Sequence, residues 1–253
     1  MIIDHPQIKD IPDLMKLWKE AFEDSDEFLK IFFATAFSPM RSRRITVDGT
    51  TVAALYWFDC TYNGKKIAYV YAVATAKAYR GQGLCHILMN DAHTILKSHG
   101  YTGTILVPGR KELFGFYNRL GYETCSYVNE IKCKKSDRKL KISKIGKEEY
   151  AKLRRQYLPE GSVIQERENL DFLERYASFY SGRDFVLATQ CKKEALHGIE
   201  LLGNLPTAPD IVNTLGYKNG SFRTQGKDTP FAMYHSFDKG EQSAPTYFGL
   251  AFD

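Results

Sequence analysis

A strand, a glycine-bearing loop and the start of a helix follow one another between residues 73 and 85, and this stretch constrains the fold more than any other. Val-Ala-Thr ends an apolar run, Arg80, Gly81 and Gly83 lie in the loop, and a helical pattern begins at Leu84. Glycines let backbone N–H groups approach an anion closely, and the helix dipole adds about half a positive charge there. The stretch predicts either an anion site, with Arg80 as a charged ligand, or an ordinary turn that needs glycine.

The spacing of these glycines separates the stretch from better-known phosphate loops. It has no Gly-Lys-Ser or Gly-Lys-Thr, so a P-loop nucleotidase is not expected. No Gly-x-Gly-x-x-Gly follows a first strand, which argues against a dinucleotide-binding Rossmann unit.

Periodicity around the loop predicts an α/β (α+β) fold with a mixed, mostly antiparallel central sheet flanked by helices. Asp48-Gly49 and Asn63-Gly64 are hairpin signals between apolar runs, and Gly100 and Gly121 are expected to end helices. In chain order the expected elements are strand 2–3, helices from about 10 and from 24–25, strands 44–48, 51–59 and 66–75, a long helix 83–99, strand 102–107, a short helix 111–120 and strand 122–132.

A polar, charged segment over 134–139 predicts a boundary between a domain at 1–135 and a second domain at 136–253. Asn213-Thr214-Leu215-Gly216-Tyr217 echoes Asn118-Arg119-Leu120-Gly121-Tyr122, so the two halves are expected to share an architecture. The second half has no counterpart of the glycine loop. Strand-like segments over 231–237 and 246–252 are expected to close its sheet.

Composition excludes several classes of protein. The net charge of +5 is too small and dispersed for a nucleic-acid surface, and no apolar run approaches the roughly 20 residues of a membrane span. Five cysteines without a Cys-x-x-Cys pair favour reduced thiols, and six histidines lack metal-ligand spacing. With no visible leader after Met1, the sequence predicts a cytoplasmic protein with no metal, membrane or nucleic-acid partner.

Two motifs together resemble those of the GCN5-related N-acetyltransferase (GNAT) superfamily. Arg80-Gly81-Gln82-Gly83-Leu84-Cys85, preceded by Tyr79, is similar to the family's Arg/Gln-x-x-Gly-x-Gly/Ala loop. Phe116-Tyr117-Asn118-Arg119-Leu120-Gly121-Tyr122 is similar to its Phe-Tyr-x-x-x-Gly-Phe/Tyr helix end. The resemblance covers residues 1 to about 132. It implies a catalytic GNAT domain, followed by a degenerate GNAT-like domain that covers the acceptor cleft or forms a dimer contact.

The resemblance implies acetyl-CoA as co-substrate and assigns residues to its site. Loop N–H groups hold the pyrophosphate, and a bulged strand that splays from its neighbour meets the pantetheine arm. An N–H of Val73 or Thr75 stabilises the oxyanion, and the Tyr117 hydroxyl is the general acid for the CoA thiolate. The implied cofactor-binding residues are Val73, Ala74, Thr75, Arg80, Gly81, Gln82, Gly83, Leu84, Cys85 and Asn118.

Two positions in these motifs have a second interpretation. Tyr117 shares an apolar helix face with Phe116 and Leu120, as an ordinary core tyrosine does. Cys85 stands where the family has glycine or alanine, and a thiol at a helix start is expected to have a lowered pKa and to be reactive. Because the family transfers the acyl group directly, no acyl-cysteine step is expected.

No single general base for the acceptor amine is evident. Acidic residues on the first two expected helices border the family's acceptor cleft and equally suit capping and a solvated surface: Glu20, Glu23, Asp24, Asp26 and Glu27. The carboxylate of Asp253 is another candidate, because the chain terminus serves the active site in tandem-domain acetyltransferases of the enhanced-intracellular-survival type. His197 and His235 are expected to be structural.

These features favour an N-acetyltransferase that acts on a primary amine of a small molecule or peptide, with a homodimer left open. A non-catalytic acyl-CoA-binding or regulatory module is the main alternative. Acetylation of nucleic acid would need a basic, aromatic-rich face, which is not visible. Aminoacyl transfer, used by some tandem proteins of this fold, is disfavoured because those proteins lack a good pyrophosphate loop.

Overall fold

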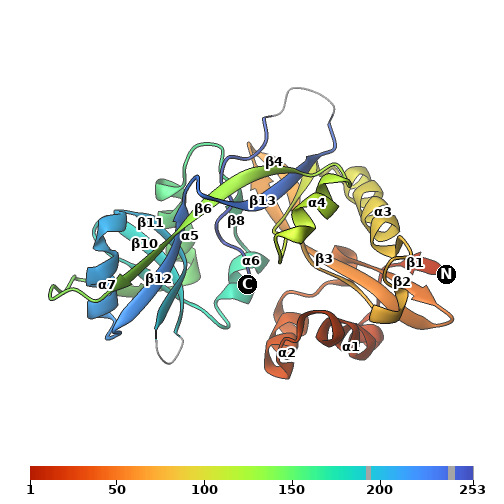
Figure 1. The fold of residues 1–253 in the computed structure, drawn as a ribbon, viewed down its shortest axis with the longest axis horizontal. Coiled ribbons are helices and arrows are strands. Elements are labelled where there is room, and N and C mark those ends of the chain that lie inside the picture. The colour runs from red at the N-terminus through yellow and green to blue at the C-terminus, as the bar shows by residue number, and fades with distance from the viewer. Residues whose placement is uncertain (192–194, 239–242, 253) are drawn as a thin grey trace. The chain divides into compact units, whose positions relative to one another are not determined.

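The computed structural model describes residues 1–191, 195–238 and 243–252, with Cys191 described by its backbone only (Figure 1). Two compact units form within the chain. Unit 1 comprises Met1–Glu123 and Met233–Ser243, and unit 2 comprises Thr124–Ala232 and Ala244–Asp253. Each unit therefore draws on both halves of the sequence, and the boundary expected at 135/136 stays a prediction. No helix among the described residues is long and apolar enough to cross a membrane.

Unit 1 is built on a sheet with the strand order β1-β2-β3-β4-β5-β13. Its elements are β1 (Ile2–Asp4), α1 (Ile11–Phe22), α2 (Asp26–Thr35), β2 (Ser42–Val47), β3 (Thr50–Tyr62), β4 (Lys65–Thr75), α3 (Leu84–Ser98), β5 (Gly103–Leu106), α4 (Glu112–Asn118) and the end of β13 (Thr229–Ser236). Neighbouring strands are antiparallel except β4 and β5, which are parallel. The predicted mixed, mostly antiparallel sheet flanked by helices is confirmed.

Alternation along β3 gives its two faces to different helices. Trp57 packs in the core cluster that contains Leu88 of α3. Tyr56, the preceding residue, lies 5.2 Å from the ring of Trp18 in α1 and 5.1 Å from that of Phe32 in α2. Since successive strand side chains point to opposite faces, α1 and α2 cover one face of the sheet and α3 covers the other.

Unit 2 is a smaller α+β sheet with the strand order β6-β12-β11-β10-β9-β7. Its elements are β6 (Glu123–Lys134), β7 (Ser143–Ile145), α5 (Lys147–Tyr157), β8 (Ile164–Gln165), α6 (Glu168–Leu173), β9 (Ser178–Ser181), β10 (Phe185–Cys191), β11 (Leu196–Gly203), α7 (Ala208–Thr214) and β12 (Asn219–Gln225). β11 and β12 pair in parallel, as β4 and β5 do in unit 1. The helix between them, α7, has 7 residues where α3 has 15.

The helices α4 and α7 end in the same turn, at the two segments whose sequences echo each other. Gly121 and Gly216 have φ of 82° and 83°. The residue after each glycine donates its N–H to the carbonyl of Tyr117 at 3.1 Å or of Val212 at 3.0 Å. This is a helix end closed by a left-handed glycine. Val212 thus holds in α7 the place that Tyr117 holds in α4.

The expectation that 231–237 and 246–252 close the second sheet is wrong for 246–252 and for the end of β13, whereas the start of β13, up to Ala232, does lie in unit 2. Met233–Ser236, the last residues of β13, pair with β5 in unit 1, and β6 pairs with β12 in unit 2. Residues 246–252 form no strand. This buried segment instead makes isolated contacts, such as the 2.6 Å bond from Gln165 Nε2 to the Leu250 carbonyl. Both outcomes depend on which distant segments pair with these residues, and a local apolar pattern does not carry that information.

A buried ion pair holds the terminal segment within unit 2. Glu200 of β11 accepts bonds from Arg154 of α5 at 2.6 and 2.9 Å, and from the hydroxyls of Tyr150 and Tyr247 at 3.0 and 3.1 Å. Glu200 is 1% exposed and Arg154 is 2% exposed. Because a buried charge must be paired and hydrogen-bonded, α5, β11 and the terminal segment depend on one carboxylate.

Arg154→Met is expected to lower the free energy of unfolding by about 3 kcal/mol or more, because it leaves the Glu200 carboxylate buried without a counter-charge. Arg155→Met is the matched control on the same helix. Arg155 is exposed and pairs with Glu166, and such a pair contributes about 0–1 kcal/mol. Urea unfolding measures both variants, and equal losses would contradict the assigned role of the buried pair.

Candidate active site

The strand β4 carries a bulge near its end. Its pairing with β3 shifts between Ala74, which faces Ala54, and Tyr71, which faces Tyr56, so two residues of β4 oppose one of β3. Ala72 within the bulge has φ of 49°, a left-handed conformation that is strained for a residue with a Cβ. Bulges of this kind re-aim backbone groups beside active sites. A bulge is therefore present in the strand where the resemblance implied one.

The strands β4 and β5 separate soon after they meet. They pair at Ala68 with Thr104 and at Tyr69 with Ile105, and β5 ends at Leu106. β4 continues to Thr75. Residues 70–75 consequently extend past the region paired with β5, and a sheet ladder on that side does not use their backbone. Such a strand edge suits an extended ligand.

The loop after β4 has open space around its two glycines. Gly81 and Gly83 have φ of 76° and 77°, and a Cβ added to either would meet no described atom within 4 Å. Gly83 is the N-cap of α3, and no side chain of the described residues caps this helix. Since the first N–H groups of a helix have no acceptor within it, those of Leu84 and Cys85 are available to an anion. The loop fits a pyrophosphate.

Arg80 joins the loop to the end of β4. Its Nε donates to the Thr75 carbonyl at 3.0 Å, which leaves its terminal nitrogens for an anion. Gln82 reaches back to the Ala78 carbonyl at 3.3 Å. These two bonds fix the loop beside the bulged strand.

Tyr117 of α4 lies close to the first turn of α3. Its side chain is 8% exposed, and its hydroxyl makes no hydrogen bond to the described residues. Burial, and then the nearby Cys85 thiol, raises the pKa of Tyr117 above its ordinary value. The phenol therefore stays protonated at neutral pH and suits an acid rather than a base.

The expectation of a lowered pKa at Cys85 is wrong. Burial raises the pKa of its thiol to about 11. The side chain packs against the core cluster that contains Tyr117, and this loss of water disfavours the charged thiolate. Cys85 is therefore a neutral, small apolar residue in this turn and not a reactive thiolate.

The remaining implied residues have structural partners. Ala74 is 4% exposed and Val73 packs partly against the core. The Asn118 side chain donates to the Tyr122 carbonyl at 3.3 Å and closes the end of α4. That bond does not require a cofactor.

The acidic candidates for the general base divide by their contacts. Glu20 accepts the N–H of Lys77 in the loop, Asp24 accepts from Trp18 Nε1 at 2.8 Å, and Asp26 pairs with Lys19. Glu23 and Glu27 are exposed. Capping and surface contacts account for most of this group, and Asp253 lies outside the described residues.

Tyr122, which packs against the Tyr117 ring, belongs to a hydrogen-bonded cluster that the sequence alone does not indicate. The Tyr122 hydroxyl lies 2.6 Å from Thr104 Oγ1 and 2.8 Å from His93 Nε2. The His93 ring stacks on His235 at 4.7 Å. These residues come from α3, β5, the end of α4 and β13, so only the fold brings them together.

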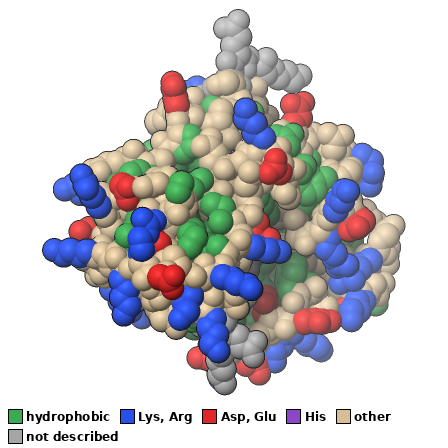
Figure 2. Space-filling view, turned by 60° about the vertical axis from the view of Figure 1, so that its left-hand side comes forward, with side chains coloured by type: hydrophobic (Ala, Val, Ile, Leu, Met, Phe, Trp, Pro, Cys, Tyr) green, Lys and Arg blue, Asp and Glu red, His purple; other side chains and the backbone are tan. Residues whose placement is uncertain are grey.

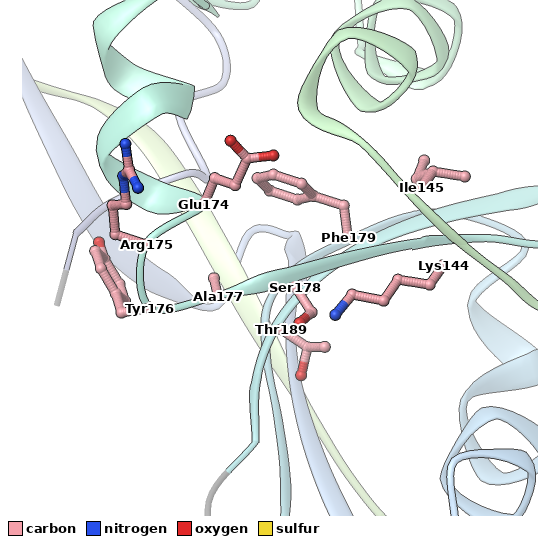
Figure 3. Close-up of a pocket in the computed structure, with 9 residues that line it drawn as sticks. All are labelled: Lys144, Ile145, Glu174, Arg175, Tyr176, Ala177, Ser178, Phe179 and Thr189. Atoms are coloured by element: carbon pink, nitrogen blue, oxygen red, sulfur yellow. The ribbon is translucent and has the colours of Figure 1, made fainter. Parts of the chain in front are cut away.

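A cavity of about 440 Å³ lies elsewhere, in unit 2 (Figure 3). Lys144, Glu174 and Arg175 line it, beside Ser178 and Thr189. It has no glycine loop, and the Glu174 carboxylate forms an ion pair with Lys147 at 3.4 Å.

On the face in Figure 2, basic and acidic side chains are interspersed, in keeping with a dispersed surplus of charge. No metal-ligating cluster occurs among the described residues.

Comparison with known proteins gives a family for one part of the chain and a fold for nearly all of it. Residues 3–125 match the model of the acetyltransferase (GNAT) domain. A GCN5-related N-acetyltransferase from Anabaena variabilis has a TM-score of 0.72 at 13% identity, covering 92% of this chain and 72% of its own. A GCN5-related N-acetyltransferase from Kribbella flavida has a TM-score of 0.69 at 13% identity; the match covers 92% of this chain and 70% of that protein. Eis1 from Mycobacterium abscessus has a TM-score of 0.69 at 11% identity, with 94% of this chain and 74% of that protein covered. At these identities the likeness shows the fold alone. No curated protein matches the sequence.

The buried position of His93 is expected to make the fold sensitive to acid. Burial, and then the neighbouring His235, lowers the pKa of His93 to about 3, against about 6.5 in an unfolded chain. Between these values the unfolded chain binds the extra proton. Stability is therefore complete above about pH 6.5 and falls as the pH drops toward about 3, by up to about 1.4 kcal/mol per unit.

Urea unfolding at a series of pH values measures this slope. His93→Gln is expected to flatten it by about one proton, while Asn90→Gln, at an exposed position of the same helix, removes no titrating group and serves as the control. An unchanged slope in His93→Gln would show that another group carries the acid sensitivity.

Proposed function

Because residues 3–125 belong to the GNAT acetyltransferase family, we propose that this chain is an acetyl-CoA-dependent N-acetyltransferase that acts on a primary amine of a small molecule or peptide. The observation that carries the proposal is the bulged end of β4. This end is no longer paired with β5, and it precedes a helix start that no side chain of the described residues caps. Family membership supports an acyltransferase in general. The acetyl donor, the amine acceptor and a cytoplasmic location are parts of the proposal.

The donor binds along β4 and the loop that follows it. N–H groups of Gly81, Gln82, Gly83, Leu84 and Cys85 hold the pyrophosphate, helped by the dipole of α3 and by Arg80. The free edge of 73–75 binds the pantetheine arm as an added strand would. Open space at Gly81 and Gly83 supports this placement, because side chains there would project toward the phosphates.

The chain's residues then stabilise a direct transfer. The acceptor nitrogen attacks the thioester carbon, and an N–H of Val73 or Thr75 hydrogen-bonds the developing oxyanion. The C–S bond breaks, and Tyr117 gives its phenolic proton to the leaving sulfur. The proton lost by the amine restores the phenol, directly or through water. The raised pKa of Tyr117 favours its protonated form before the step.

Unit 2 contributes no second donor site in this proposal. Its short helix α7 follows β11 through Asn204–Thr207, a connection without the paired glycines of unit 1. Val212 replaces the tyrosine at the matching helix end. We assign unit 2 the role of a non-catalytic, GNAT-like domain.

Tyr117→Phe is expected to lower kcat by about 10²- to 10⁴-fold, the usual contribution of a general acid, with the KM for acetyl-CoA little changed. Tyr127→Phe, at an exposed position, is the control. The measurement is release of CoA with a panel of primary amines. Equal rates in Tyr117→Phe and the unmodified protein would remove Tyr117 as the acid. Binding of acetyl-CoA without turnover on any amine would favour an acyl-CoA-binding module instead.

A further inference from the structure

The sheet of unit 1 is completed by a strand from near the C-terminus of the chain. Met233 pairs with Leu106 and His235 with Thr104, antiparallel to β5. The approach is close, because a Cβ on Gly103 would lie 2.7 Å from the His235 carbonyl oxygen. This pairing fixes His235 of β13 beside α3 and the end of α4, the helices that carry the candidate site.

His235 uses this position to hold the turn that ends α4. Its Nδ1 donates to the carbonyl of Gly121, 114 residues earlier in the chain, at 2.8 Å. The plane of the imidazole stacks on the ring of His93 in α3, at an angle of 10°. Gly121 itself has φ of 82° and leaves no room for a Cβ, which would meet His235 Nδ1 at 2.9 Å.

The same turn sets the position of Tyr117. The Tyr117 carbonyl accepts the N–H groups of Leu120 at 2.9 Å and Tyr122 at 3.1 Å. The Tyr122 ring packs edge-on against the Tyr117 ring at 5.9 Å, and its hydroxyl is bound to Thr104 and His93. A shift of the turn would therefore move both the backbone and the ring of Tyr117.

We propose that His235 is a positioning residue for Tyr117, so that the C-terminal strand is part of the catalytic unit. This inference rests on the proposed function. His235 touches neither donor nor acceptor and acts through the Gly121 carbonyl and the stacked His93 ring. The groups that face this pair are Tyr122, Thr104, Phe237 and the Gly121 carbonyl, with Lys97 bonded to the Phe237 carbonyl nearby.

The effect should fall on turnover and not on donor binding. A general acid displaced by about 1 Å from the reacting atoms costs about 10²-fold in rate. The pyrophosphate loop lies at the start of α3, and His93 lies more than two helical turns farther along it. Loss of the His235 bond therefore leaves the loop in place.

The test compares His235→Leu, which removes the donor, with His235→Asn, whose side-chain amide can donate from nearly the same point. His235→Leu is expected to lower kcat about 10- to 100-fold with the KM for acetyl-CoA changed less than about twofold. His235→Asn should recover most of the rate. His99→Leu is the matched control, because the hydrogen bonds of the His99 ring to described residues stay within its own helix end. Thermal unfolding confirms that each variant is folded.

A double-mutant cycle separates positioning from general destabilisation. If His235 acts through Tyr117, His235→Leu costs nothing further in a Tyr117→Phe background. An undiminished loss there, or a rise in KM equal to the fall in kcat, would overturn the inference. If His235→Leu turns over at the unmodified rate, the inference fails and the proposed function stands. If the unmodified protein consumes no acetyl-CoA with any amine or with water, the proposed function fails first.

Discussion

The separation of β4 from its parallel neighbour is the constraint on which the site depends. Two strands that stayed paired would satisfy each other's backbone groups and leave no edge for a ligand. The bulge at Ala72 takes β4 out of regular register at the point where pairing with β5 has ended. The glycine loop and the uncapped start of α3 follow in the chain, so a free strand edge and the proposed anion site lie in sequence along one segment. Tyr117 adds a protonated phenol beside the first turn of the helix.

Exchange of strands joins this site to the rest of the chain. β6 leaves the segment that forms the site and completes the sheet of unit 2, whereas the end of β13 returns to complete the sheet of unit 1. The ion pair at Glu200 fixes the segment after β13 within unit 2. Neither half of the sequence therefore contains all the strands of one sheet.

Features with local causes could be predicted from the sequence. Asp48-Gly49 and Asn63-Gly64 adopt the positive φ values of two-residue hairpin turns, and α3 ends at Ser98, just before Gly100 with its positive φ. The path of β13 could not be predicted, because its apolar pattern suits either sheet. The pKa of Cys85 depends on the packing of α4 against it, and the bond from His235 to Gly121 joins residues 114 apart. The motifs of the donor loop were visible, but the residues that position Tyr117 were not.

The most direct measurement is calorimetric binding of acetyl-CoA to the unmodified protein and to Gly83→Asp and Gly83→Asn. The two variants have nearly the same shape and share the cost of a side chain at φ of 77°, but only aspartate places a negative charge at the start of α3. We expect binding in the micromolar range, about 10-fold or more weaker in Gly83→Asp than in Gly83→Asn, because the carboxylate repels the pyrophosphate. No binding by the unmodified protein, or equal affinities in the two variants, would contradict a donor site at this loop.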